Sequence, residues 1–153
     1  MADEEDQIKI SNQQELQQSI LYLEFIKEQL TTLNEQLEIL ELAIKEHNQA
    51  IETLNDFKNL NKNDEILFPI GADSLVFAKI ADPSKVILNI GTGLAKEEKL
   101  MDAIGKLSSR IEKIEGNKTK IRETVQGLSD QATMLSNTIE EKYKEFQESN
   151  LTE

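Results

Sequence analysis

The chain has 153 residues, of which 38% are hydrophobic, and it contains neither Trp nor Cys. It is long enough for one ordinary domain but supplies little material for a large globular core, and without Cys it carries no disulfides or thiolate chemistry. The net charge of −12 repels phosphate backbones and anionic lipid surfaces, which argues against nucleic acid and membranes as partners.

Residues 1–10, MADEEDQIKI, predict an acidic N-terminal tail. This charge is the opposite of the basic start of a signal peptide, and no apolar run approaches the roughly 18 to 20 residues of a membrane span. We therefore expect a cytoplasmic protein.

Residues 11–60 predict one long coiled-coil helix. An apolar residue recurs every seventh position from Leu16, and a second series follows three residues later, which is the a and d pattern of a coiled-coil seam. Neither Gly nor Pro lies between Ser11 and Leu60, so the segment can continue as one helix of about 45 to 50 residues. The seam consists of Leu16, Ser19, Leu23, Ile26, Leu30, Leu33, Leu37, Leu40, Ile44, His47, Ile51 and Leu54.

Residues 64–96 break the heptads and contain both prolines, Pro69 and Pro83. Four β-rich runs, EILFPIG, DSLVFAKIAD, KVILNIG and GLAKEE, are separated by the turn signals GAD, DPS and GTG. The segment predicts two consecutive β-hairpins that link the helices.

The stretch VILNIGTGLAKEE also invites interpretation as a phosphate-binding loop, because Lys96 follows Gly91 and Gly93 closely. However, Lys96 replaces the third glycine of a dinucleotide fingerprint, and no long helix opens directly at the glycines within a βαβ unit. The glycines therefore predict a tight hairpin turn, and we expect no cofactor.

The two predicted hairpins carry apolar residues on both faces. Exposing such side chains forfeits roughly 1.5 to 3 kcal/mol for each large one, and a pair of hairpins alone is marginally stable. We therefore predict that the insert is an oligomerisation module whose strands form an inter-subunit sheet or β-barrel. The alternation of side chains along a strand leaves open which pair shares a face with Leu67, either Val76 with Ile80 or Leu75 with Phe77. The candidate oligomerisation residues are Ile66, Phe68, Ile70, Leu75, Phe77, Val86, Leu88 and Ile90.

Residues 97–147 predict a second coiled-coil helix, and residues 148–153 a C-terminal tail. Two helices of matched length bury their narrow apolar stripes on each other if the chain turns back between them. The predicted fold is mainly α, an antiparallel two-helix coiled-coil hairpin with two short β-hairpins inserted between the long helices. The second seam consists of Leu100, Ile104, Leu107, Ile111, Ile114, Lys118, Ile121, Val125, Leu128, Ala132, Leu135, Ile139 and Phe146.

Two long heptad helices flanking LFPIGADSLVFAKIADPSKVILNIGTGLAKEE resemble a prefoldin subunit of the alpha class, and more an archaeal than a eukaryotic one. The resemblance covers roughly Leu16 to Phe146, and the sequence of the two hairpins is its specific part. Thr92 departs from the family pattern, because a smaller residue is expected between the two glycines. It implies a hexamer of two alpha-type and four beta-type subunits with coiled-coil tentacles. It also implies ATP-independent capture of non-native proteins at the tentacle tips and their delivery to a group II chaperonin.

Few residues of the chain suggest catalysis, since there is one His, no Cys and no carboxylate cluster away from the helix surfaces. We therefore predict that the protein is not an enzyme and has no catalytic or metal site. His47, at a d position, is interpreted as a tolerated polar seam residue rather than a pH sensor. Lys118, at an a position, is interpreted as a register or pairing device that snorkels outward.

The two predicted helices meet at a free end near the chain termini, where the antiparallel register places Leu16 near Ile139 and Leu23 near Ala132. Apolar residues there lie outside the a and d positions, and a polar coiled coil gains nothing structural from them. Flexible apolar side chains suit the capture of varied unfolded sequences. The candidate client-binding residues are Leu16, Ile20, Leu21, Phe25, Met134, Ile139, Tyr143 and Phe146.

Two other functions compete with a holdase chaperone. One is a structural coiled-coil or filament-forming prefoldin-like protein without client transfer, and the other is a nucleotide-binding or regulatory module based on the Gly-x-Gly. The second needs a phosphate loop that the spacing does not supply.

Overall fold

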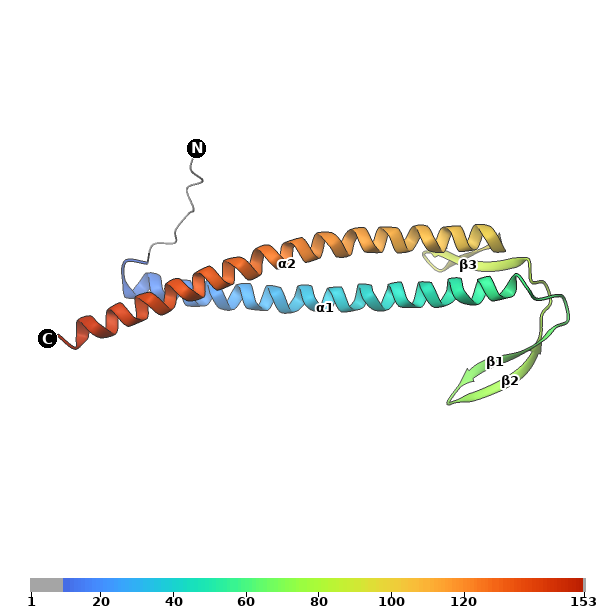
Figure 1. Cartoon of the computed structure of the whole chain (residues 1–153), viewed down its shortest axis with the longest axis horizontal. Helices are drawn as coiled ribbons and strands as arrows, with labels where there is room; N and C mark the ends of the chain where they lie inside the picture. Colours follow the sequence, from blue (N-terminus) through green and yellow to red (C-terminus); the bar gives the residue numbers. More distant parts are fainter. Residues whose placement is uncertain (1–9, 153) are drawn as a thin grey trace, which may run out of the picture. The chain divides into compact units, whose positions relative to one another are not determined.

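The computed structural model describes residues 10–152. The element order is α1 (Gln13–Phe57), β1 (Glu65–Gly71), β2 (Ser74–Lys79), β3 (Lys85–Gly91), β4 (Leu94–Lys99) and α2 (Leu100–Asn150), shown in Figure 1. This arrangement confirms the predicted fold class of two long helices with two antiparallel β-hairpins between them. The inter-subunit barrel involves further chains and stays a prediction.

Helix α1 begins with a capped first turn. The Asn12 side-chain oxygen accepts a hydrogen bond of 2.9 Å from the Glu15 amide, and the Glu15 carboxylate accepts bonds from the amide and hydroxyl of Ser11 at 2.6 and 2.7 Å. These bonds satisfy amides that a helix start leaves without partners. The bonds from the hydroxyl and the amide of Ser11 also hold the pKa of Glu15 below its usual range.

Every predicted seam residue of both helices is buried or half-buried. His47 is half-buried, and its Nδ1 donates to the Ala43 carbonyl oxygen at 2.7 Å, because a carbonyl oxygen can only accept. The prediction that Lys118 snorkels outward is wrong, since the residue is only 9% exposed. The long aliphatic stem of a lysine fills seam space, and no buried side-chain nitrogen or oxygen in residues 10–152 lacks a hydrogen-bond partner.

The chain divides into two compact units, the first comprising residues 10–39 and 117–152. Its core is a cluster of Leu23, Ile26 and Leu135, with Leu30, Leu128, Ala132 and Ile139 packed against it. The cluster brings Leu23 and Ala132 together, in agreement with the antiparallel register predicted from the heptads. A hydrogen bond of 3.0 Å from the Gln131 amide nitrogen to the Tyr22 hydroxyl also joins the helices.

The second unit comprises residues 40–116 and contains both hairpins. In each hairpin a two-residue turn with positive φ joins the strands, Ala72-Asp73 in one and Thr92-Gly93 in the other. Both turns match the twist of antiparallel strands, as primed turns do. The register slips just before each turn, between Pro69 and Gly71 and between Asn89 and Gly91, which marks a β-bulge. The Gly-x-Gly stretch is therefore a hairpin turn, as predicted.

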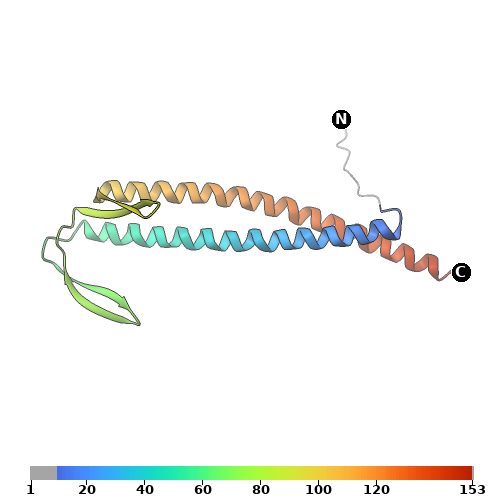
Figure 2. The same ribbon diagram turned by 180° about the vertical axis from the view of Figure 1, so that it is seen from behind.

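Backbone hydrogen bonds fix the base of each hairpin. Ile80 receives a bond from the Asn63 amide at 2.7 Å and donates one to the Asp64 carbonyl at 3.0 Å, and Ser84 accepts one from the Leu100 amide at 2.9 Å. In two opposite views the β3–β4 hairpin lies along the first turns of α2 (Figures 1 and 2). The buried apolar residues of this unit are Ile80, Leu88, Leu100, Ala103 and Leu107.

Neither helix combines, within residues 10–152, the length and apolarity needed to cross a lipid bilayer.

Candidate functional site

The predicted client-binding residues divide into a packed group and an exposed group. Leu16 is buried, Ile139 packs against the core of the first unit, and Phe146 is half-buried. These three side chains contribute to the packing of the unit rather than to its open surface. The exposed group is Ile20, Leu21, Phe25, Met134 and Tyr143.

Sequence reasoning missed Tyr22, which is also exposed and belongs to the same unit. Its ring stacks on Phe25, with centroids 6.4 Å apart and an interplanar angle of 17°. The Gln131 amide orients the hydroxyl, so the tyrosine presents a fixed amphipathic ring. Its i, i+3 spacing from Phe25 was the available signal. We call Ile20, Leu21, Tyr22, Phe25, Met134 and Tyr143 the distal apolar surface.

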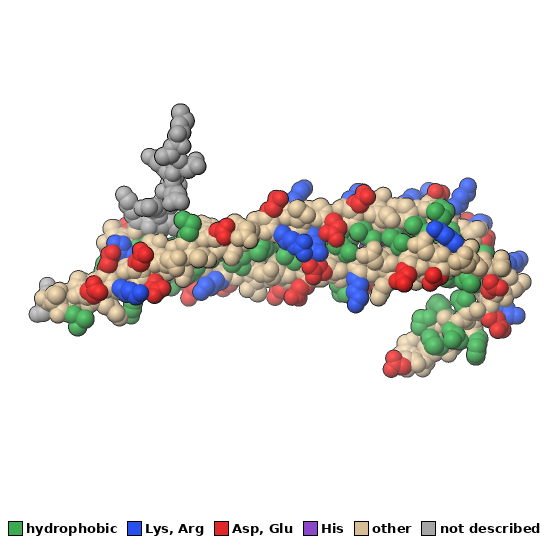
Figure 3. Space-filling model, viewed as in Figure 1, with side chains coloured by type: hydrophobic (Ala, Val, Ile, Leu, Met, Phe, Trp, Pro, Cys, Tyr) green, Lys and Arg blue, Asp and Glu red, His purple; other side chains and the backbone are tan. Residues whose placement is uncertain are grey.

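Exposed apolar residues also occur farther along α1, at Ile39 and Leu42. Elsewhere acidic and basic side chains are interspersed over the helices, as the face in Figure 3 shows. Single exposed apolar residues are ordinary on proteins. What distinguishes the distal apolar surface is that two of its aromatic rings stack on each other.

The β1–β2 hairpin exposes apolar side chains on both faces, and hydrophobic atoms gather on it in Figure 3. Leu67 lies opposite Phe77, and Phe68 opposite Val76. Residues directly opposite share a face, so Leu75 and Phe77 share the face of Leu67, which settles the alternative that alternation left open. Phe77 is 83% exposed, and a hairpin with two bare apolar faces requires a covering partner.

The β3–β4 hairpin differs because one face packs within its own unit. Val86 lies opposite Glu98, and Leu88 opposite Lys96. This face is the packed one, since Leu88 is only 8% exposed and Val86 half-buried, whereas Ile87 on the other face is 77% exposed. The contact of Glu98 with Lys106 shows that it turns toward α2. Leu88 is thus buried within the subunit. The exposed residues that the candidate set omitted are Leu67, Val76, Ile87 and Leu94.

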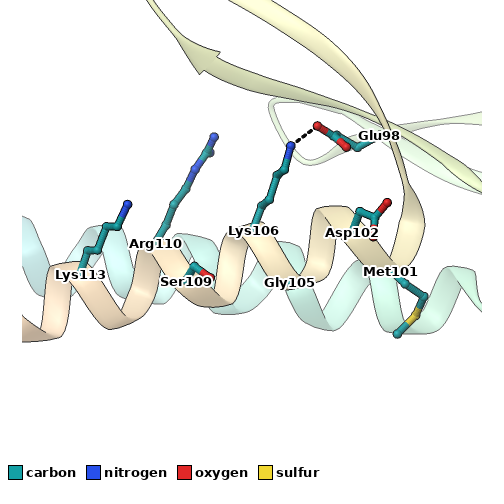
Figure 4. A pocket seen from close by; sticks show the side chains of 8 residues that line it. All are labelled: Glu98, Met101, Asp102, Gly105, Lys106, Ser109, Arg110 and Lys113. Carbon is teal, nitrogen blue, oxygen red and sulfur yellow. Dashed lines mark hydrogen bonds and ion pairs between the residues drawn. The ribbon is translucent and has the colours of Figure 1, made fainter.

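Polar contacts clamp the β3–β4 hairpin to α2, and Figure 4 shows the one between Lys106 and Glu98. Lys106 donates to the carboxylate of Glu98, Lys96 lies 3.5 Å from the same oxygen, and Arg110 donates to the Asn89 carbonyl. The bond from Lys106 holds the pKa of Glu98 below its usual range, against the raising effect of desolvation. We call the Glu98–Lys106 and Asn89–Arg110 contacts the hairpin clamp.

The exposed apolar surfaces described above are suited to binding macromolecules. No group of three or more metal-ligating side chains comes together within residues 10–152. The two notable features are the apolar faces of the hairpins and the distal apolar surface.

Comparison with known proteins gives consistent matches. Residues 26–145 match the family model described as "Prefoldin subunit". A prefoldin subunit alpha from Methanoculleus marisnigri is 32% identical over 130 residues, which cover 85% of this chain and 87% of that protein. A prefoldin subunit alpha from Archaeoglobus fulgidus is 28% identical, with 82% of this chain and 92% of that protein covered.

Solved structures share the fold. A cryo-EM structure of filamentous PFD from Methanocaldococcus jannaschii has a TM-score of 0.67 at 20% identity, covering 75% of this chain and 95% of that chain. The crystal structure of the prefoldin beta subunit from Thermococcus strain KS-1 has a TM-score of 0.55 at 17% identity, covering 88% of this chain and 95% of that chain.

Fold and surfaces together define a class of protein, a coiled-coil hairpin whose inserted β-hairpins expose apolar faces suited to other subunits. The chain belongs to the prefoldin family. Its predicted resemblance to the archaeal alpha class is confirmed by relatives named prefoldin subunit alpha, and the family makes it a prefoldin chaperone subunit.

Proposed function

We propose that this chain is a subunit of an ATP-independent holdase that captures non-native proteins on the distal apolar surface and releases them to a group II chaperonin. The observation that supports capture is the group of exposed apolar side chains on the first unit, including the stacked Tyr22 and Phe25. Such side chains bind varied unfolded sequences without a fixed shape. Several arms in one complex add weak contacts into useful avidity.

The β-hairpins serve assembly in this proposal. Their exposed apolar faces favour pairing with beta-type prefoldin subunits. The family resemblance favours two alpha-type and four beta-type subunits in a hexamer located in the cytoplasm. Release without a nucleotide then depends on handover to the chaperonin.

The test of client capture is suppression of aggregation of a chemically denatured protein without ATP, using the full chain assembled with a beta-type partner. The variant Leu21→Ser/Phe25→Ser/Met134→Ser removes exposed apolar area without touching the seam. We expect it to lose most of its protection, because burial of each large side chain contributes roughly 1.5 to 3 kcal/mol.

The matched control is Ile39→Ser/Leu42→Ser, which removes apolar side chains of similar exposure farther along α1. It should assemble and protect as the unchanged protein does. Equal protection by all three proteins would remove the distal apolar surface from the mechanism.

A structural protein that forms filaments through its β-hairpins, without client transfer, is the alternative. The two bare faces of β1–β2 favour it as well. Size measurement of the chain alone separates the two: long filaments without aggregation suppression would favour the alternative.

A further inference from the structure

A groove of about 590 Å³ lies where the end of α1, the start of β3 and the start of α2 meet. Its apolar lining consists of Phe57, Leu60, Pro83, Leu100 and Met101. Its charged lining consists of Lys58, Lys85, Lys99 and Asp102. Three lysines against one aspartate is a local excess of positive charge in a chain whose net charge is −12. We call this site the basal groove.

The lysines of the basal groove include a like-charged pair on neighbouring strands. Lys85 and Lys99 lie directly opposite each other in the β3–β4 ladder, and like charges in that arrangement repel. Lys85 forms an ion pair of 3.8 Å with Glu97 between well-exposed side chains, and it also lies near enough to Asp82 to help Ser84 lower the pKa of that carboxyl. These acidic neighbours offset part of the repulsion. An anion bound beside both lysines would relieve it.

The wall of the basal groove is fixed by hydrogen bonds of its own. The Asp82 carboxylate accepts bonds from the amide and hydroxyl of Ser84 at 2.9 and 2.6 Å, and the Ser84 carbonyl accepts a bond of 2.9 Å from the Leu100 amide. Pro83 between them restricts the backbone further. A wall held in this way loses little freedom when a ligand binds.

We propose that the basal groove docks a short acidic peptide segment of a partner protein, one that carries a single large apolar side chain. The apolar lining receives that side chain, and the lysines pair with flanking carboxylates. Charge complementarity favours an acidic occupant. The lining of the groove has more lysines than acidic side chains, whereas the chain as a whole is strongly acidic. The site lies within residues 57–102 of the second unit and shares no residue with the distal apolar surface, so it is a function additional to client capture.

Fluorescence anisotropy tests the proposal with a labelled Glu-Glu-Phe-Glu-Glu peptide and the full chain, both alone and assembled with a beta-type partner. We expect saturable binding that weakens as salt is raised. A Lys-Lys-Phe-Lys-Lys peptide and a Glu-Glu-Gly-Glu-Glu peptide should each bind at least about tenfold more weakly.

The decisive variant is Lys85→Gln/Lys99→Gln. It should weaken binding of the acidic peptide by about tenfold or more and raise the thermal midpoint, because the repelling pair is gone. If these lysines had only a structural role, peptide affinity and thermal midpoint would not change in opposite directions. Lys27→Gln/Lys120→Gln makes the same charge change at exposed sites outside the groove and should alter neither quantity. If the double variant folds poorly, the single-site variant Lys58→Gln tests the loss of acidic-peptide binding in its place.

Four results would overturn the proposal. The first is an unchanged affinity of the groove variants for the acidic peptide, and the second is equally tight binding of the basic peptide. The third is loss of acidic-peptide binding once the beta-type partner is added. The fourth is binding of anionic vesicles or of a polynucleotide more tightly than the acidic peptide. The third would make the groove part of an assembly interface, and the fourth would assign it to another class of ligand. Aggregation suppression by the groove variants should stay unchanged, so failure here is separate from failure of the holdase proposal.

Discussion

Thr92 occupies a backbone conformation that β-branched residues rarely adopt, with φ at +53°. It is the first residue of the Thr92-Gly93 turn, where both residues have positive φ and Asn-Gly is the favoured pair. We predict that Thr92→Asn stabilises the chain by about 1 kcal/mol, because Asn tolerates the left-handed region better. The thermal midpoint should rise by a few degrees in circular dichroism.

The matched control for the Thr92 prediction is Thr31→Asn, an exposed position within α1. Asn and Thr have similar helix propensities, so this change should leave the midpoint nearly unchanged. A thermal midpoint of Thr92→Asn below that of the unchanged chain would contradict the prediction, because replacing Thr92 would then relieve no backbone strain.

At the scale of elements, the hairpin clamp makes the attachment of β3–β4 to α2 dependent on pH. The pKa of Glu98 is lowered in the folded chain by the hydrogen bond from Lys106. A lowered pKa means that the carboxylate contributes stability above its unfolded pKa, roughly 4.3 for a glutamate, and loses it as pH falls through the folded pKa. We therefore predict that Glu98→Gln is less stable than the unchanged chain near neutral pH, and that the difference shrinks below about pH 4. Urea unfolding measured from pH 7 to pH 3 gives this difference.

Two other carboxylates complicate the acid titration of the unchanged chain. The pKa values of Glu15 and Asp82 are also lowered, mainly by hydrogen bonds from Ser11 and Ser84 respectively. Comparison of variants isolates Glu98, because both other groups are present in each. In a Lys106→Gln background the Glu98→Gln effect should shrink to the part that Lys96 contributes, and a full-sized effect there would contradict the clamp.

The elements themselves could be predicted from local pattern. The seam follows from a seven-residue repeat, and the hairpin turns follow from glycine and its neighbours, so both are properties of short stretches of sequence. The alternation of side chains along a strand does not determine which face of the strand packs within its own subunit. Leu88 and Ile87 are equally apolar, and only the contact of Glu98 with Lys106 shows that the face of Leu88 turns toward α2.

The candidate site was predicted less completely, because exposure depends on neighbours distant in sequence. Leu16 and Leu21 lie five residues apart, yet one is buried and the other 65% exposed. The heptad position, a local signal, already separates them, since Leu16 is at a and Leu21 at f, so the burial of Leu16 was predictable. The effect of distant residues is seen instead at Tyr22. Tyr22 was overlooked because its contribution arises from stacking on Phe25 and from Gln131 of the other helix.

At the scale of the whole molecule, the β1–β2 hairpin accounts for the need for partner subunits. Its two faces together leave Leu67, Phe68, Leu75 and Phe77 open to solvent. A chain that exposes this much apolar surface on a two-stranded sheet gains stability when other strands cover it. Assembly is therefore expected to depend on these side chains more than on the coiled coil.

We predict that Leu67→Glu/Phe77→Glu prevents assembly with beta-type subunits while leaving the helices folded. The two residues face each other across the ladder, so the variant places two like charges in the buried centre of an interface, where each unpaired charge costs several kcal/mol. Native mass spectrometry should show the variant as free chain, with helical circular dichroism retained. Ile39→Glu/Leu42→Glu introduces the same charges at exposed apolar sites on α1 and should assemble normally. Normal assembly of the hairpin variant would place the interface elsewhere, on the exposed face of β3–β4 that carries Ile87.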